Sequence, residues 1–240
     1  MNRKKNILVV MATAGVLSGC VLSGNSSSIK GNGNLATSEK TVSDFEKINI
    51  NGCAEVHFYV SQDFRVVVTI DENLAEYVEI VTENNVLNIG TKNGSYLFTK
   101  FLVDIYYPVV LTSVSVSGSG SFTSMDKITV PTFKMAVSGS GKIEGIVECE
   151  NFSASVSGSG KIIVAGNSKN ANIAIAGSGK FNGDDFIINN ATIHIDGAGN
   201  ADMYVTDNLK ADISGSGGIN YRGEPKTDTN VSGSGHIRKM

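Results

Sequence analysis

The sequence predicts an all-β fold, a parallel β-solenoid (β-helix) whose rungs contain about 19–20 residues. Three observations indicate this fold: a phrase of the type Val-Ser-Gly-Ser-Gly recurs seven times, its period stays near twenty, and apolar residues alternate with small or polar ones around it. The steps between copies are 21, 19, 19, 20, 18 and 18 residues, measured between their first glycines Gly118, Gly139, Gly158, Gly177, Gly197, Gly215 and Gly233.

Each copy is flanked by the period-two alternation of a half-buried strand. The residue two before the first glycine is always Val or Ile, and an apolar row that includes Phe122 and Ile143 resumes beyond the second glycine. A helix is excluded because two glycines in five residues would cost about 1 kcal/mol each. A flexible linker is excluded because it would not hold Val or Ile at one phase in every copy.

The glycine-serine phrase is predicted to form a sharp corner that stacks on the corner of the next rung. Glycine turns the chain with positive φ without a Cβ clash, and rungs about 4.8 Å apart leave room only for small side chains. The seven first glycines are therefore predicted structural corner residues, and stacked serines are expected to pass hydrogen bonds between rungs.

The N-terminal segment has the features of a targeting sequence. Residues 1–19 contain a basic start, Asn2-Arg-Lys-Lys5, and an apolar run over 7–16 that is too short to span a bilayer. Leu17-Ser-Gly-Cys20 resembles the bacterial lipobox, and this resemblance implies that Cys20 is the lipidated first mature residue. An ordinary secretory signal cut nearby is the alternative.

The remaining chain is predicted to be a tether followed by one domain. Residues 20–40, rich in Ser, Gly and Asn, are expected to be a flexible tether. Residues 41–240 are expected to be a single solenoid domain of roughly nine or ten rungs. Within it, 41–110 is an atypical capping part with a short helix predicted over 71–78, and 111–240 holds the regular repeats.

Charge and cysteine content limit the partners. Removing the three basic residues of 1–19 changes the formal net charge from −3 to −6, so a nucleic-acid partner is not expected. A membrane partner is expected only through the lipid anchor. Cys53 and Cys149 are left open between two free thiols and a disulfide.

The front half carries the residues of a family resemblance. The order is Asp44-Phe-Glu-Lys-Ile48, Gly52, Val56-His-Phe58, Val66-Val-Val68, Asn73-Leu74, Val86-Leu-Asn-Ile89, and then serial Ser-Gly-Ser-Gly corners. Over about residues 41–238 this order resembles the putative auto-transporter adhesin, head GIN domain family. The resemblance implies a right-handed β-helix and supplies no catalytic residues to carry over.

Candidate functional residues are few. Lys142, Lys161 and Lys180 occupy one phase of successive copies, which favours either a solvated edge or a binding strip for an acidic polymer or glycan. His57, His194 and His236 have no second histidine at metal-ligand spacing, and the aspartates of the later copies are scattered. No catalytic residue, metal site or cofactor is expected.

The sequence therefore predicts a non-enzymatic exported lipoprotein on the outer membrane, a rigid rod for envelope structure or for adhesion to an extended ligand. A polysaccharide lyase-like enzyme on the same scaffold and a self-assembling envelope filament are the alternatives. Because Arg238 and Lys239 follow the last corner and guard its strand edge, the protein is expected to be mostly monomeric.

Overall fold

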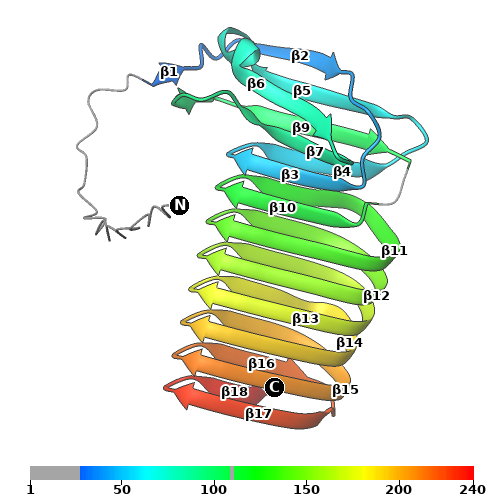
Figure 1. The fold of residues 1–240 in the computed structure, drawn as a ribbon, viewed down its shortest axis with the longest axis vertical. Coiled ribbons are helices and arrows are strands. Elements are labelled where there is room, and N and C mark those ends of the chain that lie inside the picture. Colours follow the sequence, from blue (N-terminus) through cyan, green and yellow to red (C-terminus); the bar gives the residue numbers. More distant parts are fainter. Residues whose placement is uncertain (1–27, 109–110) are drawn as a thin grey trace, which may run out of the picture.

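The computed structural model describes residues 28–108 and 111–240 (Figure 1). The predicted signal peptide, Cys20 and the first part of the predicted tether lie outside the described residues. The chain winds into stacked parallel coils, a β-solenoid of about 7 turns, so the predicted fold class is confirmed.

The regular rungs are built from long bent strands that run from one corner to the next (Figure 1). From β10 to β15 each strand pairs in parallel with the next, β15 then pairs with β16 and β17, and β16 pairs with β18. Corner glycine faces corner glycine, as Gly139 faces Gly158. The strands are β10 (Ser113–Gly118), β11 (Ser121–Gly139), β12 (Lys142–Gly158), β13 (Lys161–Gly177), β14 (Lys180–Gly197), β15 (Asn200–Gly215), β16 (Gly218–Arg222), β17 (Lys226–Gly233) and β18 (His236–Lys239).

The corners require glycine for two reasons. Gly158 has a φ of +107°, and a Cβ on it would lie 2.7 Å from the carbonyl oxygen of Gly139 in the rung above. A Cβ on the second glycine, Gly160, would lie 2.3 Å from the side chain of Val137. Adjacent corners are joined by backbone bonds, for example from Ser159 N–H to Gly139 O (2.9 Å), rather than by the expected serine hydroxyls.

The interior is filled by the apolar rows that the alternation predicts. Side chains at equivalent positions stack on each other from rung to rung and exclude water, which is the main stabilising term of such a fold. One row just beyond the corner is fully buried up to the last rung, where Ile237 is only partly buried: Phe122, Ile143, Ile162, Phe181, Ala201 and Ile219.

The first rung consists of β3 (Lys47–Gly52) and β4 (Glu55–Val60). β3 pairs in parallel with β10, and β4 pairs in parallel with β11. Gly52 faces Gly118 and has a φ of +106°, so it forms an additional corner of the same type.

Beyond β4 the chain leaves the stack and builds the other end of the molecule. The elements there are β5 (Arg65–Asp71), the 3-10 helix η1 (Glu72–Tyr77), β6 (Val78–Glu83), β7 (Val86–Thr91), β8 (Tyr96–Leu97) and β9 (Phe101–Tyr107). β7 and β9 pair in parallel with β3 and β4, whereas β6 and β5 pair antiparallel with β7 and β9. An antiparallel layer therefore lies over the first parallel rungs (Figure 1).

The predicted flexible tether extends too far along the sequence. Residues 29–40 include β1 (Ile29–Lys30), which pairs with β8, and β2 (Leu35–Lys40), which pairs antiparallel with β5. A buried carboxylate fixes this segment: Asp71 accepts hydrogen bonds from Gly33 N–H (2.9 Å) and Thr99 N–H (2.7 Å). Burial raises the pKa of Asp71, but these bonds outweigh it and hold the pKa below its ordinary value.

Two other expectations for this end need correction. The helix predicted over 71–78 is a 3-10 helix over 72–77, and Asp71 makes no capping bond because its carboxylate binds Gly33 and Thr99 instead. The stack has about 7 turns rather than nine or ten, because β5, η1 and β6 form the antiparallel layer instead of parallel rungs.

Candidate functional site on the outward faces

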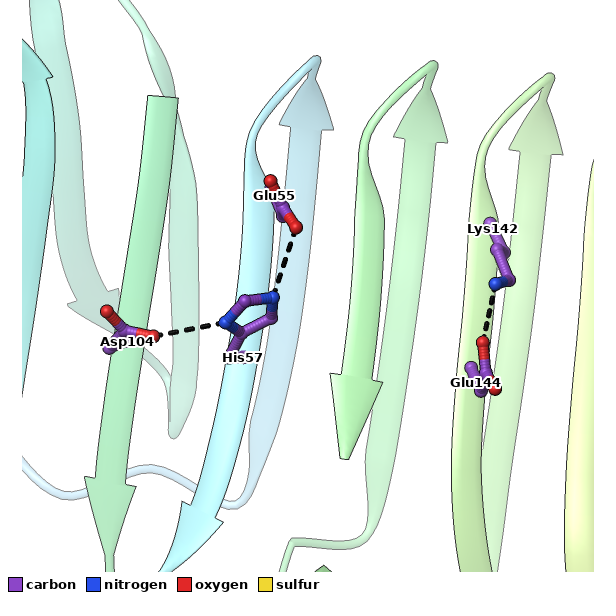
Figure 2. Close-up of polar contacts among 5 residues, drawn as sticks. All are labelled: Glu55, His57, Asp104, Lys142 and Glu144. Carbon is purple, nitrogen blue, oxygen red and sulfur yellow. Dashed lines mark hydrogen bonds and ion pairs between the residues drawn. The ribbon is translucent and has the colours of Figure 1, made fainter. Parts of the chain in front are cut away.

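The predicted lysine row lies on the outward face just beyond the corners. Lys142, Lys161 and Lys180 are register partners on β12, β13 and β14. Lys142 Nζ lies 2.5 Å from Glu144 (Figure 2), and Lys180 Nζ lies 2.6 Å from Asp202. Two carboxylates thus offset two of the three positive charges, which weakens this row as a surface for an acidic polymer.

Asp202 is held ionised by its surroundings. Partial burial raises the pKa of Asp202, but hydrogen bonds from Asn220 (2.8 Å) and Lys180, together with the charges of Lys180 and Arg222, outweigh it and lower the pKa. The pair therefore joins β14 to β15 as a stable contact between rungs.

His57 on β4 lies between two carboxylates (Figure 2). Its Nδ1 lies 3.2 Å from Asp104 Oδ1 on β9, and its Nε2 lies 3.1 Å from Glu55 Oε1. Both ring nitrogens thus contact carboxylates, and the group ties β4 to β9. Sequence reasoning missed it because Asp104 is 47 residues away; the only local signal is Glu55 two residues before His57 on a strand.

The outward face of the same end carries an aromatic contact. Tyr59 and Tyr106 stack with ring centroids 4.7 Å apart, and the Arg65 guanidinium lies 4.3 Å from the centre of the Tyr106 ring. These side chains join β4, β9 and β5, and cation–π contacts of this type contribute about 0.5–1 kcal/mol at exposed sites.

The titratable residues of the later rungs are dispersed. His194 faces Asp212 across β14 and β15, while Asp184 contacts Arg222 at 3.6 Å. Within residues 28–108 and 111–240, no group of three His, Cys, Asp or Glu side chains is placed to hold a metal ion.

Both cysteines of the described part are free thiols. Cys53 is exposed and Cys149 is half-buried. Burial raises the pKa of both thiols above the ordinary value, so neither is activated as a nucleophile.

An amide ladder runs along the strands that precede the corners, and sequence reasoning missed it. Asn170 donates to Asn151 (3.1 Å), Asn190 to Asn170 (3.3 Å) and Asn208 to Asn190 (2.7 Å). The signal was present, because asparagine stands seven residues before the corner glycine in four copies. In-register amides of this kind stabilise stacked parallel strands.

The structure has relatives among solved structures. It is similar to a crystal structure described as a putative lipid binding protein from Parabacteroides distasonis, with 30% identity, a TM-score of 0.73, and coverage of 88% of this chain and 99% of that one. A putative adhesin from Parabacteroides merdae has 29% identity, a TM-score of 0.70 and coverage of 88% and 98%. A putative adhesin from Bacteroides fragilis, at 20% identity and a TM-score of 0.82, covers 88% and 100% and shows the same fold.

No curated protein matches the chain. Among the described residues, no helix has the length and apolar character needed to cross a membrane. The family model described as "putative auto-transporter adhesin, head GIN domain" matches residues 44–225. An adhesin-like family of this kind belongs to the cell envelope or surface. The chain therefore belongs to the putative auto-transporter adhesin, head GIN domain family.

Proposed function

We propose that the protein is a non-enzymatic lipoprotein, anchored to the outer membrane through Cys20, that presents a rigid β-solenoid for adhesion to an extended glycan or cell-envelope polymer. One observation carries the proposal: equivalent outward side chains recur in register on consecutive rungs, as in the row Asn151, Asn170, Asn190 and Asn208. A surface that repeats about every 4.8 Å offers the same contacts many times to an extended chain.

The contacts of the individual titratable groups favour a structural role for them over a catalytic one. His57 has both nitrogens engaged by carboxylates, and Lys142 and Lys180 are paired with acids. The relatives are described as putative adhesins or as a putative lipid binding protein, which points to recognition of a surface component.

A binding array tests the proposed function. The full mature chain with Cys20→Ser, which removes only the lipid attachment, is applied to immobilised glycans and cell-wall polymers. We expect binding to a polymer, tighter for long chains than for short oligomers because several rungs bind at once. Binding to none of them, or release of shortened products from a bound polymer, contradicts the proposal.

Cell fractionation tests the anchor separately. The Leu17-Ser-Gly-Cys20 motif is followed by Val21 rather than by an aspartate, which agrees with outer-membrane sorting. The Cys20→Ser protein is expected in the soluble fraction, whereas the parent sediments with outer membranes. If both sediment alike, another feature anchors the chain.

A further inference from the structure

We propose that a notch on the face before the corners binds the acidic groups, carboxylate or sulfate, of an anionic glycan. The inference rests on the proposed function, because it names the ligand class and the place where the ligand binds. The notch is a depression of about 560 Å³ lined by Lys47, Thr112, Ser113, Pro131, Thr132 and Lys134, and is called the lysine notch below.

Three consecutive rungs form the lysine notch. Lys47 on β3 faces Ser113 on β10, and Ser113 faces Lys134 on β11. The two lysines are thus two rungs apart, about 10 Å along the axis. Both side chains are exposed, and their flexible stems allow the two ammonium groups to converge on an anion above Ser113.

Neither lysine of the notch is paired with an acid, although Glu46 precedes Lys47 and Glu150 lies near Pro131. The next outward positions of the same rungs are amides, hydroxyls and a methyl group, with no carboxylate among them: Asn49, Asn51, Ser115, Ser117, Ala136 and Ser138. Ser115 donates to Asn49 Oδ1 (2.9 Å), so this polar surface is internally ordered.

The lysine row Lys142, Lys161 and Lys180 on the other face differs because two of its lysines are paired with acids. Lys142 and Lys180 are within 2.6 Å of Glu144 and Asp202, whereas no described carboxylate lies within ion-pair distance of Lys47 or Lys134. An ammonium that is not paired with an acid attracts a ligand anion more strongly than a paired one. The charge distribution therefore favours the lysine notch, although the sequence drew attention to the lysine row.

The lining also favours a polymer over a bilayer as the source of the anion. Binding to a membrane surface draws on apolar side chains that enter the acyl region. The notch has hydroxyls from Ser113 and Thr132 and a single small apolar ring, Pro131, and none of the exposed large apolar side chains among residues 28–108 and 111–240 lines it. Lysines beside hydroxyls match a sugar that carries both acidic and neutral oxygens.

Two double variants with the same charge change test the inference. Lys47→Gln with Lys134→Gln removes both positive charges from the lysine notch. Lys142→Gln with Lys180→Gln is the control on the other face. Each is made in the full mature chain with Cys20→Ser, and affinity is measured for polygalacturonate, sulfated dextran and neutral dextran. Thermal melts verify that both variants are folded.

We expect the parent to bind the two acidic polymers and to lose affinity as salt rises. The notch variant should lose about tenfold or more, as expected when bonds to charged groups are removed, and the control less than about twofold. Ser113→Glu, which places a carboxylate between the lysines on an outward position, should reproduce the loss.

The remaining outcomes separate the two proposals. Equal losses in the two double variants, or binding of neutral dextran alone, overturns the lysine notch and leaves the proposed function standing. Failure to bind either acidic polymer overturns the lysine notch, and the proposed function is overturned as well only if the binding array of glycans and cell-wall polymers also shows no binding. Binding to phosphatidylglycerol vesicles but not to the acidic polymers, lost in the notch variant, assigns the site to a lipid headgroup and overturns the glycan assignment.

Discussion

The regular rungs and the N-terminal end of the molecule differ in how their strands pair. In the regular rungs each strand adds to the previous one in parallel, one turn per repeat (Figure 1). At the N-terminal end β5 and β6 run against β9 and β7, and β2 runs against β5. The regular part is thus set by repetition of one contact, and the N-terminal end by single contacts between distant segments.

The difference predicts where each part is vulnerable. A change at a repeated contact strains two neighbouring rungs at once, because the residue above and the residue below are the same type in the same place. A change at the N-terminal end removes one particular contact and affects the elements that meet there.

The largest effect is expected from a corner glycine within the stack. Gly158→Ala combines a backbone at φ +107° with a Cβ 2.7 Å from Gly139 O, whereas Gly52, at φ +106°, has nothing within 4 Å of its added Cβ. We expect Gly158→Ala to lower the free energy of unfolding by about 3 kcal/mol or more, and Gly52→Ala by about 1–2 kcal/mol from backbone strain alone.

Denaturant unfolding of the two alanine variants measures this difference. Ser155→Ala, on an outward strand position of the same rung as Gly158, is the control and should change stability by less than about 0.5 kcal/mol. Equal effects of Gly158→Ala and Gly52→Ala would show that clashes between stacked corners do not matter.

The second prediction concerns Asp71 at the N-terminal end. Asp71→Asn replaces an oxygen that accepts from Gly33 or Thr99 with an amide that cannot accept, and it removes the charge. We expect local opening of β2 and of the segment before β9, with the regular rungs unaffected. Hydrogen exchange should show loss of protection at the amides of Gly33, Thr99 and β2, with the regular rungs still protected.

The pH dependence of this contact has a definite sign. Because the pKa of Asp71 is lower in the folded protein than its ordinary value of about 3.9, the contact stabilises the fold above that pH and this contribution is lost as pH falls through the folded pKa. Acid should therefore expose β2 in the parent, and the Asp71→Asn variant should lack this dependence. An unchanged acid response in the variant would assign it to other groups.

A smaller effect is expected at the amide ladder. Asn190→Ala removes the bond to Asn170 and the bond from Asn208, both on the exposed face. The expected loss is about 0.5–1 kcal/mol, since exposed hydrogen bonds contribute little net stability. Asn189→Ala, next in sequence and bonded to Thr206 instead, is the control for a ladder-specific effect.

The smallest effect on stability is expected at the last rung. β17 is exposed along its whole length, and Lys239 is paired with Glu224. We expect Arg238→Val with Lys239→Thr to leave the melting temperature nearly unchanged and to turn a monodisperse protein into one that associates, because charges guard open strand edges. Light scattering of the parent and of the double variant measures association. A parent protein that already forms a stable oligomer would contradict the idea that Arg238 and Lys239 prevent pairing at this strand edge.

The sequence allowed the regular rungs to be predicted because one contact is repeated and can be read from aligned copies. The corner glycines and the buried row from Phe122 to Ile219 follow directly from that alignment. The N-terminal end was predicted less well, because the pairing of β2 with β5 depends on the buried carboxylate of Asp71 and has no periodic signal.

For the candidate site, register was predictable and side-chain pairing was not. The alignment placed Lys142, Lys161 and Lys180 in one row, as observed. It did not reveal that Glu144 and Asp202 neutralise two of them, since that depends on side-chain conformations between neighbouring rows. It also missed the lysine notch, because Lys47 and Ser113 are neighbours only through the long excursion between β4 and β10.

The long chain segment between β4 and β10 affects the order in which the rungs fold. Neighbouring residues of the regular rungs are about 19 positions apart in the chain, as for Asn151 and Asn170, whereas β3 and β10 are joined across 66 positions, as for Asn49 and Ser115. The strands β7 and β9 also come later in the chain than β3 and β4, with which they pair. Because closing long loops slows folding, the late repeats are expected to form first, and the earliest-synthesised rung last.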